Sequence, residues 1–194
     1  MTTIHRPRNR TKAEIRAERR AGIDVIVKDY AARPWPIRAF YGRPTLRREA
    51  RVYGRLAGVA GIPRCLGLEG RDALVIERVP GRPLSAWRGP LPDGVLDRLA
   101  EIVADVHRRG VAIADLHHSN VLVADDGTVH LVDFAIARIA RDPARPGPLV
   151  RLLMQLDDHA VARLVARHRG LPEPRPTGLF GALYRLGRRL KGRR

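Results

Sequence analysis

The chain has 194 residues, 44% hydrophobic and 29% charged, a composition typical of a globular protein and not of a disordered one. No apolar run reaches the ~18 residues of a membrane-spanning helix, and the first residues are charged, unlike a signal sequence. The single cysteine, Cys65, excludes an internal disulfide and a cysteine zinc cluster, and agrees with a cytoplasmic location. The net charge of +17 favours anionic partners such as nucleotides, phosphate, nucleic acid or an acidic membrane face, with an ordinary basic surface as the alternative.

The first half of the chain predicts mainly strands, because β-branched apolar runs alternate with turn residues. The expected elements are two short strands within residues 1–20 around a turn at Asn9-Arg10-Thr11, a buried strand over 23–27 ending at Lys28, an irregular segment over 33–44 with three prolines, a helix opening at Pro44 and Thr45, and two strands within 61–81 around a turn at 69–72.

The second half predicts a hairpin between helices. The expected elements are a helix over about 93–109 capped by Gly110, strands over 120–124 and 128–132 joined by the turn Asp125-Asp126-Gly127, and two or three helices after residue 136 with breaks at 143–148 and 170–178. This order predicts an α+β protein with a small strand-rich lobe, residues 1–80, a mainly helical lobe, 81–175, and a basic tail, 176–194.

Three polar side chains stand at the ends of apolar runs around this hairpin. Folding the hairpin at Asp125-Asp126-Gly127 brings Asn120 and Asp133 to the same end, where two oxygen donors suit a hard cation such as Mg²⁺. Asp115, slightly farther from the metal, would orient and deprotonate a hydroxyl. Together these groups have the chemistry of phosphoryl transfer.

Five motifs in sequence order, between residues 23 and 138, resemble those of the protein-kinase-like superfamily. The first is "VIVK" with the nucleotide lysine Lys28, and the second is "LRREARVYGRL" with its partner Glu49. The third, "LVIERVPGRPL", resembles the hinge, whose backbone at Glu77 and Val79 would meet adenine. The last two are D-x-x-x-x-N at Asp115 and Asn120, and Asp133-Phe134-Ala135 in place of D-F-G. The closest resemblance is to the small bacterial lipopolysaccharide-kinase and RIO-like branch.

The resemblance implies a minimal two-lobed kinase fold that binds ATP and Mg²⁺ between an antiparallel sheet with one helix and a helical lobe. Lys28 and Glu49 would set the phosphates, and Asn120 and Asp133 would hold the metal. The γ-phosphoryl group would pass to a hydroxyl of a membrane glycolipid, of a small molecule such as an aminoglycoside, or of a protein serine. A silent pseudokinase that serves as a nucleotide-binding or scaffold module is the alternative.

Structural explanations exist for the same residues. A lysine at a strand end often extends to solvent, Glu49 has arginine neighbours on its helix, and His117 and His118 suit a solvent-facing loop. The chain also departs from the kinase pattern, because it lacks a G-x-G-x-x-G before Lys28 and an A-P-E after Asp133, and has Ile113-Ala114 where kinases have H-R.

The carboxyl-terminal segment 178–194 combines a leucine stripe with a cationic remainder. The stripe consists of Leu179, Leu183, Leu186 and Leu190. Such a helix would lie on an anionic membrane face, which predicts a peripheral position on the inner side of the cell membrane, or would pack on the domain. Nucleic acid is an unlikely partner, because aromatic residues make up only 5% of the chain and offer no stacking platform.

Overall fold

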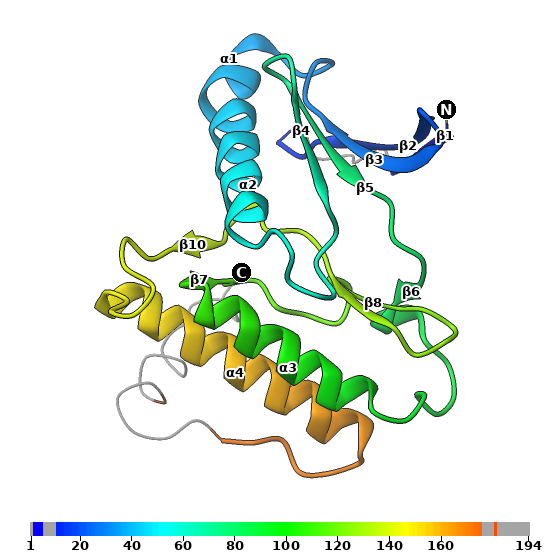
Figure 1. Ribbon diagram of the computed structural model, residues 1–194, viewed down its shortest axis with the longest axis vertical. Helices are drawn as coiled ribbons and strands as arrows, with labels where there is room; N and C mark the ends of the chain where they lie inside the picture. Colours follow the sequence, from blue (N-terminus) through cyan, green and yellow to red (C-terminus); the bar gives the residue numbers. More distant parts are fainter. Residues whose placement is uncertain (1, 6–10, 176–180, 182–194) are drawn as a thin grey trace, which may run out of the picture.

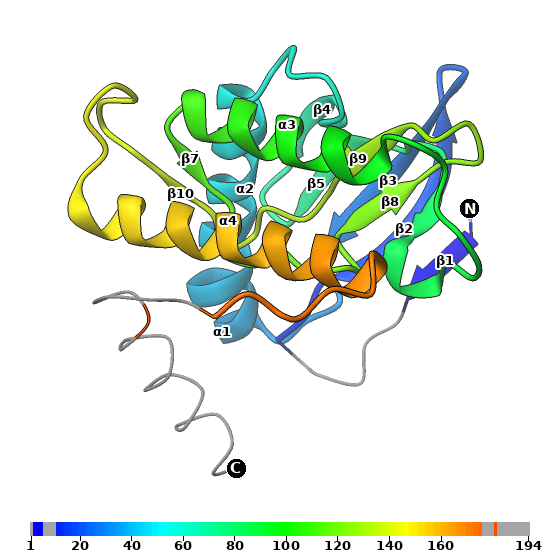
Figure 2. The same cartoon turned by 90° about the horizontal axis from the view of Figure 1, so that it is seen from below.

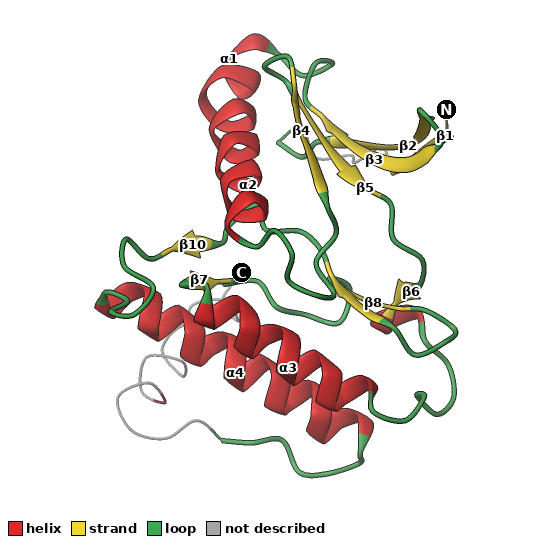
Figure 3. Ribbon diagram, viewed as in Figure 1, coloured by secondary structure: helices red, strands yellow, loops and turns green. Residues whose placement is uncertain are grey.

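The structure is a computed structural model that describes residues 2–5, 11–175 and 181. One sheet and a long helix form the amino-terminal lobe, and two antiparallel helices underlie the second lobe (Figure 1). The strands gather in the first lobe and at the junction between the lobes (Figure 3). The predicted tail 176–194, with its leucine stripe, lies outside the described residues except for residue 181, and so does most of the predicted turn at residues 9–11.

The first lobe contains a five-stranded antiparallel sheet in the order β1-β2-β3-β5-β4. Its strands are β1 (Thr2–His5), β2 (Glu14–Arg20), β3 (Ile23–Asp29), β4 (Cys65–Glu69) and β5 (Ala73–Glu77). The strands predicted around Val25 and within 61–81 are therefore confirmed. Val25 and Val27 are buried on one face of β3, so the pleat places Ile26 and Lys28 on the other face.

The helix of the first lobe begins earlier than the sequence predicted. The expected irregular segment 33–44 is wrong, because α1 (Trp35–Ile37), a π-helix η1 (Arg38–Gly42) and α2 (Arg43–Arg55) follow one another without a break. Pro36 lies in the first turn, where its missing N–H is no loss. The backbone N–H of Arg43 bonds to the carbonyl of Arg38, so the ladder widens to π spacing directly before Pro44.

Helices α3 (Val95–Arg108) and α4 (Pro148–His168) lie side by side in opposite directions (Figures 1 and 2). The predicted helix over 93–109 is thus confirmed. The helices expected after residue 136 are confirmed in part, because residues 136–147 hold a short strand and turns and one helix occupies 148–168. The helix expected beyond the break at 170–178 lies outside the described residues except for residue 181. Pro148 starts this helix, the first-turn position that proline favours.

Two small sheets link the lobes. One has the order β6-β8-β9, with β6 (Arg82–Pro83), β8 (Val121–Val123) and β9 (Val129–Leu131), and the other pairs β7 (Val111–Ala112) with β10 (Arg138–Ile139). The predicted hairpin is confirmed, with Val121 opposite Leu131 and Val123 opposite Val129.

The larger of two hydrophobic clusters in the described residues runs through both lobes. It includes Tyr53 of α2, Leu74 of β5, Leu99 of α3 and Val161 of α4. The lobes contact each other at Gly61, whose carbonyl accepts a 2.8 Å hydrogen bond from the Leu131 N–H. A Cβ at Gly61 would clash with Ile102 Cδ1 and would lie 2.8 Å from the Val129 carbonyl oxygen, so no larger residue fits there. Among the described residues, no helix has the length and apolarity to cross a membrane.

Candidate active site

A cavity of about 420 Å³ lies between the lobes and collects most of the predicted site residues. Its lining comprises Ile15, Ile26, Lys28, Tyr53, Pro63, Ile76, Glu77, Arg78, Val79, Gly81, Ser119, Asn120, Leu122, Val132 and Asp133. Apolar side chains of both lobes form its walls, and its polar groups converge from β3 and the hairpin. This combination is typical of a small-molecule site.

Lys28 lies between two carboxylates. Its Nζ is 2.5 Å from Glu49 Oε1 and 3.0 Å from Asp133 Oδ1, and its side chain is largely buried. Burial lowers the pKa of Lys28, but the negative charges of Glu49 and Asp133 outweigh this effect and raise it. Lys28 is therefore a fixed ammonium group at neutral pH. The alternative explanation, that this lysine at the end of a strand extends to solvent, is wrong.

Glu49 connects α2 to the Asp133-Phe134-Ala135 segment. Its side chain is buried, and Oε1 accepts a hydrogen bond of 3.3 Å from the Phe134 N–H as well as the Lys28 contact. Two further contacts join the same elements: Tyr53 packs edge-on against Phe134, with ring centroids 5.1 Å apart, and Arg48 Nη1 donates to the Ala135 carbonyl at 3.3 Å. The position of α2 thus fixes both Lys28 and Asp133.

Asp133 adopts a left-handed backbone conformation, with φ of 70°, which is uncommon outside glycine and is characteristic of functional sites. Its Oδ1 accepts hydrogen bonds from Lys28 and, at 3.3 Å, from the Ala135 N–H. Burial raises the pKa of this carboxyl, but the charge of Lys28 prevails and lowers it. Oδ2 has no hydrogen-bond partner among the described residues and is available to a ligand.

The loop before β8 carries the two remaining polar residues of the predicted site, Asp115 and Asn120. Asn120 is buried, and its Nδ2 donates to the Asp115 carbonyl at 3.1 Å, while its own carbonyl accepts from the Val132 N–H at 3.0 Å. Asn120 and Asp133 therefore meet at one end of the hairpin, as predicted. The Asp115 side chain is exposed and lies outside the cavity lining, and His117 Nε2 is 3.7 Å from its Oδ2.

Asp157 is a positioning residue that the sequence reasoning missed. It is buried on α4 and accepts hydrogen bonds from the backbone N–H of Ile113 at 2.7 Å and of Ala114 at 2.9 Å, and His107 Nε2 lies 3.3 Å away. These contacts hold the backbone immediately before Asp115, where Ala114 has a positive φ of 65°. A signal exists in the sequence, because Asp157 shares a helical stripe with the apolar residues Val161 and Leu164.

The donor set fits a magnesium ion. The Asn120 side-chain oxygen and Asp133 Oδ2 are hard oxygen donors beside one cavity, and Mg²⁺ is usually held by one or two such side chains together with substrate phosphates. The described residues contain no cluster of three or more histidine, cysteine or acidic groups that would bind a metal without a phosphate.

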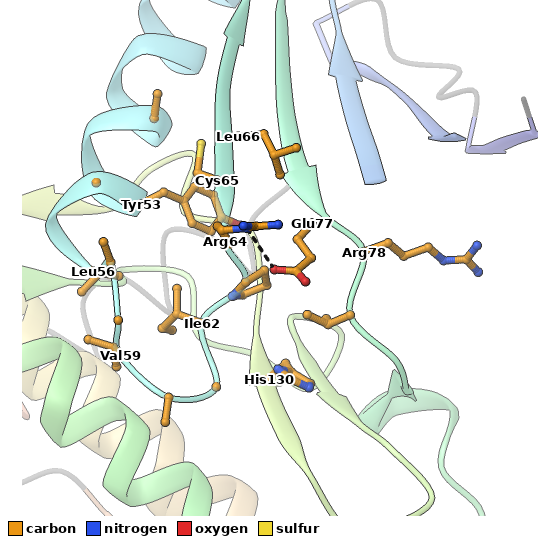
Figure 4. A pocket seen from close by; sticks show the side chains of 18 of the residues that line it. Tyr53, Leu56, Val59, Ile62, Arg64, Cys65, Leu66, Glu77, Arg78 and His130 are labelled. Atoms are coloured by element: carbon orange, nitrogen blue, oxygen red, sulfur yellow. Dashed lines mark ion pairs between the residues drawn. The ribbon is translucent and has the colours of Figure 1, made fainter. Parts of the chain in front are cut away.

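A second cavity, of about 800 Å³, lies beside the segment that joins the lobes (Figure 4). Glu77, Arg78 and Val79 line both cavities. The Glu77 side chain turns to the second cavity, where it lies 3.7 Å from Arg64, and its N–H donates to the Arg64 carbonyl at 2.8 Å. A backbone contact from Glu77 to adenine can therefore come only from its carbonyl, whereas the backbone groups of Val79 have no hydrogen bond to a described residue.

Comparison with known proteins gives relatives that are named as a synthase and as a protein kinase. The chain is 33% identical to the probable SapB synthase of Streptomyces coelicolor over 178 residues, covering 75% of this chain and 19% of that protein. It is 32% identical to the serine/threonine-protein kinase PknL of Mycobacterium tuberculosis over 134 residues, covering 64% of this chain and 32% of the kinase. The chain thus spans between a fifth and a third of the length of these relatives. No family model matches the sequence.

Solved structures of the Rio2 kinase from Chaetomium thermophilum have a similar fold. The ADP/Mg²⁺-phosphoaspartate complex superimposes with a TM-score of 0.66 over 93% of this chain and 60% of that chain, at 14% identity. A second structure of the same kinase gives 0.67 over 93% and 61%, also at 14% identity. The chain therefore has the two-lobed α+β fold of the protein-kinase-like superfamily, as its motifs from Lys28 to Asp133 predicted.

Proposed function

We propose that the chain is an ATP- and Mg²⁺-dependent phosphotransferase that moves the γ-phosphoryl group to a hydroxyl acceptor. The observation that carries this proposal is the convergence of Lys28, Asp133 and Asn120 on one interlobe cavity, with Glu49 buried behind Lys28. A fixed ammonium group beside hard oxygen donors is what positioning of a triphosphate requires.

Each residue has a defined task in this mechanism. Lys28 binds the α- and β-phosphates, Glu49 keeps it oriented, and the carbonyl of Glu77 and the backbone of Val79 bind adenine. Asn120 and Asp133 hold Mg²⁺, which supplies charge neutralisation to the phosphates. Asp115 orients the acceptor hydroxyl and accepts its proton while the acceptor oxygen bonds to the γ-phosphorus and the bond to the β–γ bridging oxygen breaks, releasing ADP.

For the acceptor, we propose first a sugar hydroxyl of a membrane glycolipid, as in lipopolysaccharide kinases, and then a small molecule or a protein serine. The net charge of +17 supports an anionic membrane surface as the place of action. Residues 178–194 would bind the inner face of the cell membrane, and the chain would otherwise be cytoplasmic.

The missing G-x-G-x-x-G favours a second candidate function, that of a catalytically silent nucleotide-binding or scaffold module.

Substitution of Asp115 by Asn tests the proposed reaction. The variant keeps the shape of the side chain but cannot accept the proton, so label transfer from γ-labelled ATP should fall by about 10²–10⁴-fold, with nucleotide affinity nearly unchanged. Transfer is measured with lipopolysaccharide, an aminoglycoside and a serine-containing protein as acceptors.

Asp125→Asn is the matched control, since it makes the same chemical change at the exposed hairpin tip, where Arg82 is the only partner of Asp125 among the described residues. It should retain full transfer. Unchanged transfer by Asp115→Asn would disprove the assigned base. A parent chain that binds Mg·ATP but phosphorylates nothing would support the silent module instead.

A further inference from the structure

A basic hollow of about 200 Å³ lies beside the catalytic loop on the carboxyl-terminal lobe. Its walls come from the 3₁₀ helix η2 (Leu84–Ala86) and the residues after it, from His118, and from the carboxyl-terminal end of α4. The lining is Leu84, Ser85, Trp87, Arg88, His118, Leu164, Arg167 and His168. Whole small-molecule ligands usually occupy about 300–1,000 Å³, so the hollow suits one group of a larger molecule.

Positive charge in this hollow is not compensated by any carboxylate of the described residues. Four lining side chains carry basic nitrogen atoms, and no lining residue is acidic. Arg88 donates only to the backbone carbonyls of Ser85 and Trp87, at 3.3 and 3.2 Å, and neither Arg88 nor Arg167 forms an ion pair with a described carboxylate. By contrast, the neighbouring Arg169 pairs with Asp97 at 3.1 Å.

The histidine at the end of α4 responds to this charge. Burial lowers the pKa of His168, and the nearby positive groups Arg167 and His118 lower it further. Cations in the last turn of α4 also suit the helix dipole. That role explains Arg167 and His168, but it does not explain why Arg88 and His118 join them from other segments.

The hollow is mechanically linked to the proposed active site. The Ser85 N–H donates to the His118 carbonyl at 3.0 Å, and the hydroxyl of Ser119 donates to that of Ser85 at 3.3 Å. Ser119 and Asn120 line the interlobe cavity, so the same loop borders both sites. A molecule held in the hollow would lie next to the loop that carries Asp115.

We propose that the basic hollow binds a phosphate group of the acceptor, so that the molecule to be phosphorylated already carries a phosphate monoester. This inference rests on the proposed phosphotransferase function. Two arginines match phosphate because each guanidinium can donate two parallel hydrogen bonds to its oxygens, and each imidazole ring adds an N–H donor.

The test follows the NMR signals of the His118 and His168 rings in the full chain during titration with inorganic phosphate, at constant ionic strength. We expect a saturable shift with phosphate and a much weaker response to acetate. The double variant Arg88→Ala/Arg167→Ala should lose at least tenfold in phosphate affinity.

The control is Arg141→Ala/Arg151→Ala, which removes the same charge elsewhere on the exposed surface. Arg151 lies on the same helix as Arg167 but about 24 Å away along its axis. The control should change affinity less than twofold. Absence of a saturable shift, an equal response to acetate, or an equal loss in the control pair would each overturn the phosphate site.

Glucose 6-phosphate and phosphoserine then distinguish a sugar phosphate from a phosphorylated protein as the source of the group. Tighter binding of either one than of inorganic phosphate supports the inference and identifies the source of the phosphate group.

Binding of Mg·ATP to the parent chain is measured separately by fluorescence. Phosphate binding without Mg·ATP binding would overturn the proposed function and leave the anion site, whereas the reverse result would overturn only the anion site.

Discussion

At the scale of single residues, Asp157 controls a loop from the buried side of a neighbouring helix. Its two carboxylate oxygens accept hydrogen bonds from the N–H groups of Ile113 and Ala114, which have no other acceptor among the described residues. The backbone at Ala114 has a conformation that is unfavourable for alanine, so these two hydrogen bonds offset a local cost. Asp115 is consequently presented to solvent by a loop that would otherwise relax.

Replacement of Asp157 by Ala should therefore destabilise the protein by about 2–6 kcal/mol, since one buried and one partly buried N–H group lose their acceptor at about 1–3 kcal/mol each. Urea denaturation of parent and variant measures the difference. The control, Asp158→Ala, removes the adjacent and exposed carboxylate and should cost less than about 0.5 kcal/mol. Similar losses for both variants would show that Asp157 does not anchor the loop.

Sequence reasoning was most effective where the signal is local. Lys28 follows a β-branched run, and Asp125-Asp126-Gly127 is a hairpin turn, so the strands and the meeting of Asn120 with Asp133 could be predicted. Asp157 could not be assigned a partner, because its hydrogen bonds reach residues more than forty positions away. A helical stripe reports burial but not which backbone groups it will meet.

At the scale of elements, α2 is the part that couples Lys28 to the Asp133 segment. Glu49 contacts both Lys28 and Phe134, so a displacement of α2 would disturb two of the groups in the cavity. The proline-rich start of this helix was misread because proline usually ends a helix, whereas here Pro36 lies in a first turn and Pro44 follows a π turn.

Substitution of Glu49 by Gln should lower the free energy of unfolding by about 3 kcal/mol, near the lower end of values for broken buried ion pairs, because Asp133 still faces Lys28. The stability contributed by these charges depends on pH. Because folding raises the pKa of Lys28, its contribution to the free energy of unfolding is complete at neutral pH and is lost only as strongly alkaline pH approaches the raised pKa. The pKa of Asp133 is lowered by folding, so the pH dependence is reversed. The contribution of Asp133 to the free energy of unfolding is present above about pH 4 and is lost in acid.

The measurement is denaturant unfolding at neutral pH, with Glu101→Gln as control, because Glu101 forms only an exposed pair with Arg98 on α3. We expect the control to change stability by less than about 0.5 kcal/mol. A Glu49→Gln variant as stable as this control would show that the buried pair contributes nothing net.

At the scale of the whole molecule, the two lobes share one hydrophobic core and contact each other closely at Gly61. A ligand between the lobes should therefore stabilise the entire chain and not a single lobe. Binding to the folded state alone raises stability by about 2.7 kcal/mol at a ligand concentration a hundredfold above Kd.

Mg·ATP at that saturation should raise the melting temperature by roughly 5–10 °C, given about 2–4 °C per kcal/mol for a chain of this size. A thermal-shift titration measures the effect, and chelation of Mg²⁺ with EDTA should remove most of it. The variant Asp133→Asn should show a clearly smaller Mg²⁺-dependent part of the shift. An unchanged melting temperature at millimolar Mg·ATP would rule out the interlobe cavity as a nucleotide site.

The lone cysteine of the sequence has a practical consequence. Cys65 lies on β4 in the wall of the second cavity, near the segment that joins the lobes, and is only partly buried. Burial raises the pKa of its thiol, so alkylation should proceed best in mildly alkaline buffer. A maleimide dye would attach there and nowhere else, without removal of competing thiols, and would give spectroscopists a single-site reporter of rearrangements next to the interlobe hinge.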